Sequence, residues 1–199
     1  MASTDRKATV NIEKLTMWKL TKDNEDSPTY GEAVEFGKIL MTVKDTPTTT
    51  SAELRGDGVK TDEAFEQTGG SIELGIHALN STDRTLLYGE SVKKGTNVIA
   101  KDDTPNYVCV ALMTKRADGL YNLKKYVKTI FVPSEEDESQ TESDGIKYAT
   151  TTIKGTYSPL LSTNVAKYVR YGVNPVSDAA VITSWFSDAN YTGPDEKDN

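Results

Sequence analysis

The sequence predicts a mainly β protein, and three observations support this prediction. Residue types that favour a pleated, half-buried backbone (Thr, Val, Ile, Tyr, Phe and Trp) supply 66 of the 199 residues. Residues 71–78 alternate between polar or small side chains and apolar ones, the period of a strand with one buried face. The longest unbroken apolar run, residues 107–113, has seven residues, far fewer than the roughly 20 that a membrane-spanning helix needs. A chain of this length is expected to form one domain.

Two strand regions are expected before residue 44. Residues 10–20 are rich in strand formers with apolar side chains at both parities, which predicts a strand covered on both faces. Residues 21–28 are polar and predict a loop. Residues 30–43 return to apolar spacing, with Gly31 and Gly37 as expected bends, and fit two strands or one bent strand equally well.

Residues 44–70 are expected to form a projecting hairpin or a long loop. The stretch 45–50 (DTPTTT) predicts a turn or linker, because Asp and Pro favour turns. Residues 55–58 (RGDG) give a strong turn signal between short strand candidates.

The clearest strand is 71–79, in which Leu74 is expected in the core and His77 on the wet face. A short helix is predicted at about 82–88, with a candidate N-cap at Asn80 and Gly89 as its C-terminal stop. This is the one helix that the pattern predicts without an alternative.

The best hairpin signal lies in the second half of the chain. Residues 107–113 (YVCVALM) predict a central strand buried on both faces. A turn at 117–119 leads into a strand at 120–132. Four apolar side chains of this second strand share one parity and are expected on one face: Tyr121, Leu123, Val127 and Phe131.

An acidic segment follows at 133–145 and contains no basic residue. Its six acids are Glu135, Glu136, Asp137, Glu138, Glu142 and Asp144. Two interpretations remain open: a solvated loop, or a surface that repels polyanions or meets a basic patch on a neighbour.

The remaining elements are less defined. Residues 146–155 and 165–171 are strand candidates, and 177–186 fits either a helix or a last strand. The polar C-terminal tail, 187–199, is expected to fray.

Composition excludes several classes of function. One histidine and one cysteine, His77 and Cys109, cannot supply the ligands of a zinc site, so we expect no metal and no cofactor. A net charge of −7 argues against binding nucleic acid by neutralising phosphates. The N-terminus does not fit a secretory signal, so synthesis in a cytoplasm is expected. A hydrophobic fraction of 36% is low for a globular domain, which predicts long polar loops or surfaces completed by partners.

A series of short motifs, in order over roughly residues 8–186, resembles the major tail proteins of long-tailed, siphovirus-type phages of Gram-positive hosts. None of these motifs is catalytic, and the resemblance lies in their order. The motifs are TMWKL (16–20), TYGE (29–32), AEL (52–54), GDG (56–58), SIEL (71–74), LYG (87–89), YV (107–108), DGLYN (118–122), KTIF (128–131), IKY (146–148) and SWF (184–186).

The resemblance implies a tail-tube fold, in which two antiparallel sheets pack orthogonally as a β-sandwich or barrel with one short flanking helix. It implies a single tail-tube domain over 1–199, with its core at about 8–186. Six subunits would close into a ring, and rings would stack into a tube, because head-to-tail contacts propagate. The expected location is the virion tail, assembled in the host cytoplasm, without a membrane.

The same resemblance implies partners and contact regions. The tube would enclose a tape-measure protein, abut a tail terminator at one end and baseplate or distal tail proteins at the other, and pass double-stranded DNA during ejection without specific binding. The candidate stacking loop carries Arg55, Asp57, Asp62 and Glu63. The acidic segment is the second candidate, for an inter-subunit contact or the lumen.

Two rival functions remain. A decoration or adhesin module with a sandwich fold would share the β content and stay monomeric. An enzyme acting on sugar polymers would need two of the acids as a catalytic pair, and no pattern points to such a pair. We therefore expect a structural protein and no enzyme.

Overall fold

The computed structural model describes residues 7–37, 39–56, 59–133 and 150–194, without the side chains of 54–62. The described part of the chain is mainly β with antiparallel pairing, as predicted, and eight of its strands form one sheet. Along this sheet the order is β2-β1-β7-β8-β9-β4-β3, and β10 also pairs with β8. The strands of this sheet are β1 (Thr9–Lys22), β2 (Thr29–Glu35), β3 (Leu40–Gly56), β4 (Val59–Ile76), β7 (Tyr107–Arg116), β8 (Tyr121–Val132), β9 (Thr151–Tyr157) and β10 (Lys167–Val173).

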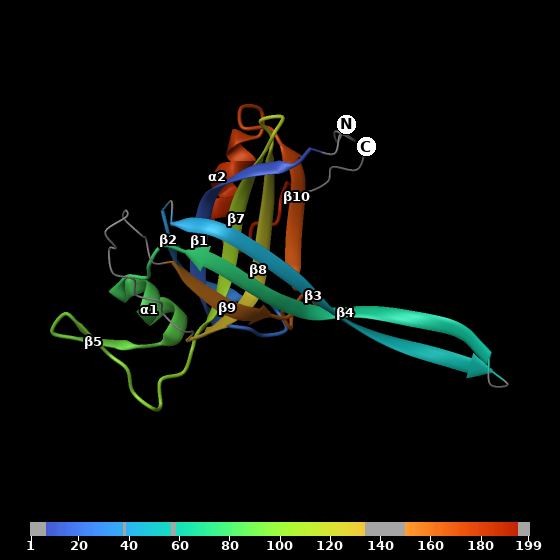
Figure 1. The fold of residues 1–199 in the computed structure, drawn as a ribbon, viewed down its shortest axis with the longest axis horizontal. Helices are drawn as coiled ribbons and strands as arrows, with labels where there is room; N and C mark the ends of the chain where they lie inside the picture. Colours follow the sequence, from blue (N-terminus) through green and yellow to red (C-terminus); the bar gives the residue numbers. More distant parts are fainter. Residues whose placement is uncertain (1–6, 38, 57–58, 134–149, 195–199) are drawn as a thin grey trace, which may run out of the picture.

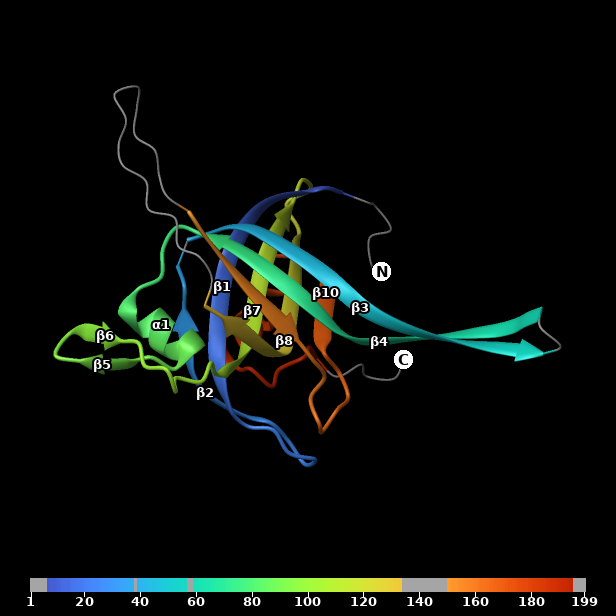
Figure 2. The same ribbon diagram turned by 60° about the horizontal axis from the view of Figure 1, so that its bottom comes forward.

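The sheet folds over itself at β8, which belongs to two layers. Residues 121–126 of β8 pair with β10, whereas residues 129–132 pair with β9. One layer therefore contains β2, β1, β7, β8 and β10, and the other contains β9, β4 and β3. The ribbon views show the two layers crossing one another (Figure 1, Figure 2). The expected pair of packed sheets is thus present as two parts of one continuous sheet.

The main core lies between these two layers. Leu15 and Met17 of β1 and Leu74 of β4 belong to it, and all three side chains are buried. The alternation in the sequence had predicted the burial of Leu74, which has no exposed surface. The other core members are Phe36, Leu40, Ile72, Ile76, Leu86, Leu87, Tyr88, Val108, Val110, Leu112, Tyr126, Phe131, Ile153 and Tyr157.

A second cluster covers the opposite face of β1 and β7, which explains why both strands are apolar at both parities. Trp185 and Phe186 of α2 (Ala179–Ser187) pack there against Trp18, Cys109 and Ala111. The segment that fitted a helix or a strand is therefore a helix. The described residues thus form two helices that flank the sheet, whereas one short flanking helix is expected from the sequence.

One face assignment in β8 was wrong. Leu123 lies in the cluster under α2, whereas Phe131 lies in the main core, although the two share a parity. The pairing register between β7 and β8 shifts between Val108 and Val110, because β8 contains one extra residue opposite this point. Side chains of β8 beyond this bulge therefore point to the opposite face from side chains of the same parity before it.

The chain after α2 is held on the body, so the predicted fraying from residue 187 is wrong for this stretch. The buried Lys125 ammonium donates hydrogen bonds to the carbonyl oxygens of Asp188, Ala189 and Tyr191 at 2.8, 3.3 and 2.7 Å. The rings of Trp18 and Trp185 flank it. Burial lowers the pKa of Lys125 to about 8. Packing therefore continues past the expected core boundary at residue 186.

The predicted short helix is present as α1 (Ser81–Tyr88). Asn80 accepts a hydrogen bond from the Asp83 N–H while the Asp83 carboxylate accepts one from the Asn80 N–H, which forms a capping box. Gly89 ends the helix with a positive φ of 73°, a conformation that costs glycine little. Two short strands, β5 (Ser91–Lys93) and β6 (Thr96–Val98), form a separate hairpin beside it.

We predict that Leu74→Ala lowers the free energy of unfolding by about 2 to 5 kcal/mol, because it leaves a cavity between the two layers. Urea unfolding followed by tryptophan fluorescence measures the loss. His77→Ala, at an exposed position in the same segment, serves as the control and should change stability by less than about 0.5 kcal/mol. Equal effects of the two substitutions would contradict the core assignment.

Candidate assembly surface

The most prominent feature of the molecule is a long hairpin that leaves the body. β4 pairs with β9 only over residues 70–76, and beyond this point β3 and β4 pair only with each other. We call residues 48–56 with 59–69 the arm. Eleven extended residues reach about 35 Å, and Figures 1 and 2 show the arm extending away from both layers. The alternative of a projecting hairpin for residues 44–70 is therefore confirmed.

The turn or linker predicted at 45–50 is wrong, because these residues lie within β3. Thr favours strands, so the run of threonines extends the strand. Pro47 is tolerated because β3 is the last strand of the sheet order, where a missing N–H can face away from the ladder.

Most described side chains of the arm are exposed, and three of them carry a carboxylate: Glu53, Glu63 and Glu66. Phe65 is 70% exposed and lies opposite Ser51. Glu53 and Glu63 are cross-strand partners on the same face as Phe65, and Glu66 lies on the other face. The arm thus presents a large aromatic ring beside two carboxylates.

Two glycines lie where the arm joins the body. Gly69 has a φ of 141°, and a Cβ there would overlap the carbonyl group of Tyr157. A Cβ at Gly70 would overlap the Tyr157 hydroxyl and lie 2.7 Å from the Thr46 carbonyl oxygen. The β3–β4 register also shifts between Thr48 and Thr49. Close approach at Gly70 and a positive φ at Gly69 therefore require glycine here.

A hydrogen-bonded cluster fixes the base of the arm to three other strands. The Asp45 carboxylate accepts hydrogen bonds from Tyr126 Oη at 2.9 Å, Tyr157 Oη at 2.8 Å and Lys167 Nζ at 2.7 Å. These donors come from β8, β9 and β10, respectively. The rings of Tyr126 and Tyr157 lie 5.0 Å apart, with the Lys167 ammonium over both. We call these four residues the anchor.

The charge of Asp45 is stabilised in this cluster. Burial alone would raise its pKa, but the hydrogen bonds from Lys167, Tyr157 and Tyr126 outweigh burial and hold the pKa of Asp45 below its usual value. Burial, together with the neighbouring carboxylate, raises the pKa of both tyrosines. Asp45 is therefore the ionised acceptor and the two tyrosines are neutral donors.

The predicted site residues are only partly placed. Arg55 lies on β3 of the arm opposite Lys60, and Asp62 lies on β4 opposite Leu54. The side chains of Arg55 and Asp62 are outside the description. Glu63 also lies on the arm, whereas Asp57 is outside the described residues. The acidic segment is outside as well, with Glu135, Glu136, Asp137, Glu138, Glu142 and Asp144.

The anchor was missed at the sequence level. Its members come from four separate strands, so no local spacing links them. One signal was available, namely an acid followed by Thr and Pro inside a β-forming stretch. That pattern also fits a turn, which is the structure that local composition predicts there.

The described residues include no candidate metal site. No three His, Cys, Asp or Glu side chains among them lie close enough to hold a metal ion. A depression of about 440 Å³ between the 23–28 and 158–164 loops has Tyr30, Tyr168 and Ser162 in its wall, with Asp26 as its one acid. Within the same described ranges, no helix has the length and apolarity to cross a membrane.

Comparison with solved structures gives a structural likeness, whereas comparison by sequence gives none. No family model matches the chain, and no curated protein matches it. A chain in the six-fold symmetrised cryo-EM structure of the anti-feeding prophage baseplate is similar, with a TM-score of 0.39 and 11% identity over 83% of this chain and 97% of that one. A TM-score of this size does not by itself establish a shared fold.

We predict that Asp45→Asn lowers the free energy of unfolding by about 1 to 3 kcal/mol near pH 7, because it removes the charge that Lys167 and the tyrosines stabilise. The folded-state pKa of Asp45 is lowered, so its contribution exists above the ordinary pKa of about 3.9 and disappears as the pH falls through the folded-state value. The two proteins should thus converge in acid. Urea unfolding between about pH 7 and pH 2 tests this.

Asp102→Asn provides the matched control, because Asp102 is exposed on a distant loop. It should follow the wild type at every pH. A constant gap between Asp45→Asn and the wild type, independent of pH, would contradict the role assigned to the Asp45 charge.

Proposed function

We propose that this chain is a structural subunit of a phage tail, without catalytic activity, that binds copies of itself head to tail. Six copies close into a ring, and stacked rings form the tail tube through which DNA is ejected. The observation that carries the proposal is the arm. A two-stranded ribbon that leaves the body with its side chains exposed is marginally stable in water and calls for a second surface.

The way in which the arm is built supports a contact function. Tyr126, Tyr157 and Lys167 hold Asp45 at its base, so the direction of the arm is fixed by the body. A fixed arm lowers the entropy cost of binding, because less freedom is lost on docking. An arm on one side of a subunit makes a heterologous contact, which closes into rings or grows into filaments.

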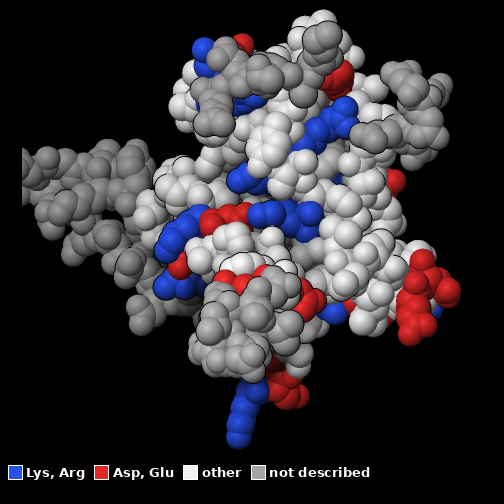
Figure 3. Space-filling model, turned by 90° about the vertical axis from the view of Figure 1, so that its right-hand side faces the viewer, with Lys and Arg blue, Asp and Glu red and all other residues white. Residues whose placement is uncertain are grey.

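The charge of the chain is compatible with a conduit. A duplex carries about one negative charge per 1.7 Å, and a basic channel would retain it. A subunit with a net charge of −7 gives an assembly that repels the duplex overall. Figure 3, which looks along the arm toward the body, shows Lys and Arg interspersed with Asp and Glu around its base. Such a mixed surface suits protein contacts, with the tape-measure, terminator and baseplate proteins as further partners.

The first test is negative-stain electron microscopy of the purified protein over a concentration series, with light scattering on the same samples. We expect hollow tubes or six-fold rings. A monomer that persists at every concentration, also with tape-measure and initiator proteins added, would contradict the proposal and favour the monomeric decoration or adhesin module.

A second test removes the arm. Deleting residues 50–66 and joining the cross-strand partners Thr49 and Gln67 through Asn-Gly keeps a hairpin turn of a favoured type. We expect a folded monomer that forms neither rings nor tubes. Circular dichroism and thermal unfolding verify the fold, since the deleted residues pair only with each other. If this variant assembled as the wild type does, the arm would not be required for assembly.

A further inference from the structure

The depression of about 440 Å³ on the body lies where three segments of the chain meet. They are the 23–28 loop between β1 and β2, the 158–164 loop between β9 and β10, and residues 189–192 after α2. Figure 2 shows the first two loops close together below the body. The volume is within the range of about 300 to 1,000 Å³ that small-molecule sites occupy. We call this depression the loop pocket.

The loop pocket has an apolar base and aromatic walls. Val127, Leu160 and Ala189 line it and are buried. Tyr30 of β2 and Tyr168 of β10 also line it, and both are partly exposed. The pocket therefore offers a ligand an apolar surface that includes parts of two aromatic rings.

The rim of the loop pocket is polar. Its exposed members include Ser27, Thr163, Asn190 and Thr192. Hydroxyl and amide side chains of this kind can both donate and accept hydrogen bonds. A ligand that carries hydroxyl groups around an apolar centre would match both the rim and the base.

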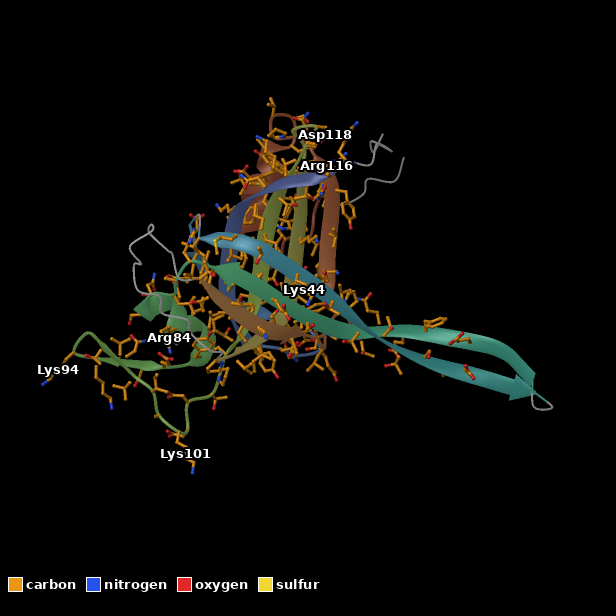
Figure 4. All side chains as sticks on the ribbon, in the orientation of Figure 1. Lys44, Arg84, Lys94, Lys101, Arg116 and Asp118 are labelled. Atoms are coloured by element: carbon orange, nitrogen blue, oxygen red, sulfur yellow. The ribbon has the colours of Figure 1, made fainter. Side chains whose placement is uncertain are left out.

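The charge of the loop pocket decides between classes of ligand. Asp26 is the one charged side chain among the described residues that line it. The cations labelled in Figure 4 belong to other segments, such as Lys94 and Lys101 on either side of β6 and Arg116 at the end of β7. An anionic ligand would meet a carboxylate here without a cation to pair with it. A single exposed carboxylate holds a cation only weakly. A neutral ligand is therefore favoured.

Hydrogen bonds hold all three sides of the loop pocket in place. Asp23 Oδ2 accepts a hydrogen bond from Lys128 Nζ at 2.6 Å, and Asp23 Oδ1 accepts one from the Leu161 N–H at 3.1 Å. One carboxylate thus joins both loops to β8. Tyr30 Oη donates to the Val127 carbonyl oxygen at 2.9 Å, which restrains the ring. The third side, the chain after α2, is held by the buried ammonium of β8 described above. A preformed pocket lowers the ordering cost of binding.

We propose that the loop pocket binds a neutral pyranose unit of a glycan. A pyranose ring has apolar C–H faces that pack on aromatic rings such as those of Tyr30 and Tyr168. Its perimeter of hydroxyl groups both donates and accepts hydrogen bonds, as the rim does. The proposal is independent of self-association, because none of the described lining residues belongs to the arm.

The test is saturation-transfer difference NMR with three probes: the methyl pyranosides of glucose, galactose and N-acetylglucosamine. This measurement observes the ligand, so it applies to an assembled protein as well as to a monomer. We expect saturation of the ring C–H protons of at least one glycoside, with a Kd on the order of 1 mM for a ligand of this size. Glucuronate should bind at least severalfold more weakly, because Asp26 repels it. Absence of saturation for all three glycosides overturns the proposal, and so does tighter binding of glucuronate or of methylammonium.

Substitutions locate the binding. Tyr168→Ala should weaken it by about tenfold or more, because a packing ring is lost. Tyr168→Phe keeps the ring and should bind within about threefold of the wild type. The matched control is Tyr171→Ala, since Tyr171 lies on the same strand, is 68% exposed and is not among the residues that line the pocket. It should bind as the wild type does, and equal losses for Tyr168→Ala and Tyr171→Ala would overturn the proposal.

A rim variant keeps the test decisive if Tyr168→Ala does not fold, which circular dichroism would show. Asn190 is exposed, so Asn190→Ala should retain the fold and weaken binding severalfold through the loss of a hydrogen-bonding group. An unchanged Kd for Asn190→Ala together with an unfolded Tyr168→Ala would place the binding outside the loop pocket and overturn the proposal.

Discussion

The arm depends on one physical constraint: a two-stranded ribbon has no core of its own. Each strand is hydrogen-bonded on one edge, and its side chains face water on both sides. Its direction must therefore be set where it leaves the body. Asp45 accepts three hydrogen bonds there from β8, β9 and β10, and Gly69 and Gly70 allow the backbone to pass directly against Tyr157. The anchor and the glycine pair together convert a flexible ribbon into an oriented projection.

The anchor is possible because β8 serves both layers. Its first half pairs with β10 and its second half with β9, which brings donors from both strands to one carboxylate. Alternation along β8 turns Tyr126 toward the main core and the preceding residue, Lys125, toward α2. Neighbouring residues of one strand thus secure different parts of the chain. Tyr126 holds the arm, and Lys125 holds the C-terminal segment.

The spacing of apolar residues was sufficient to predict the local strands and helices, because it reflects directly which face of each element is buried. Strand β7 and helix α1 follow this rule, and the apolar pattern of residues 71–78 located Leu74 correctly. Features that depend on contacts between distant residues could not be predicted from this spacing. The bulge in β8 looks like unbroken alternation, and the anchor joins residues up to 122 positions apart. The prediction of a turn at 45–50 was wrong because β3 continues through these residues and is stabilised there by pairing with β4. Local composition does not show this pairing.

Association of a chain with a net charge of −7 also constrains what its contacts can be. Copies repel one another on average, and the repulsion grows as an assembly grows. A contact between two acidic surfaces would add to this cost. A contact that joins acidic side chains to lysines, with apolar groups at its centre, removes like-charge repulsion locally and leaves the rest of the surface acidic.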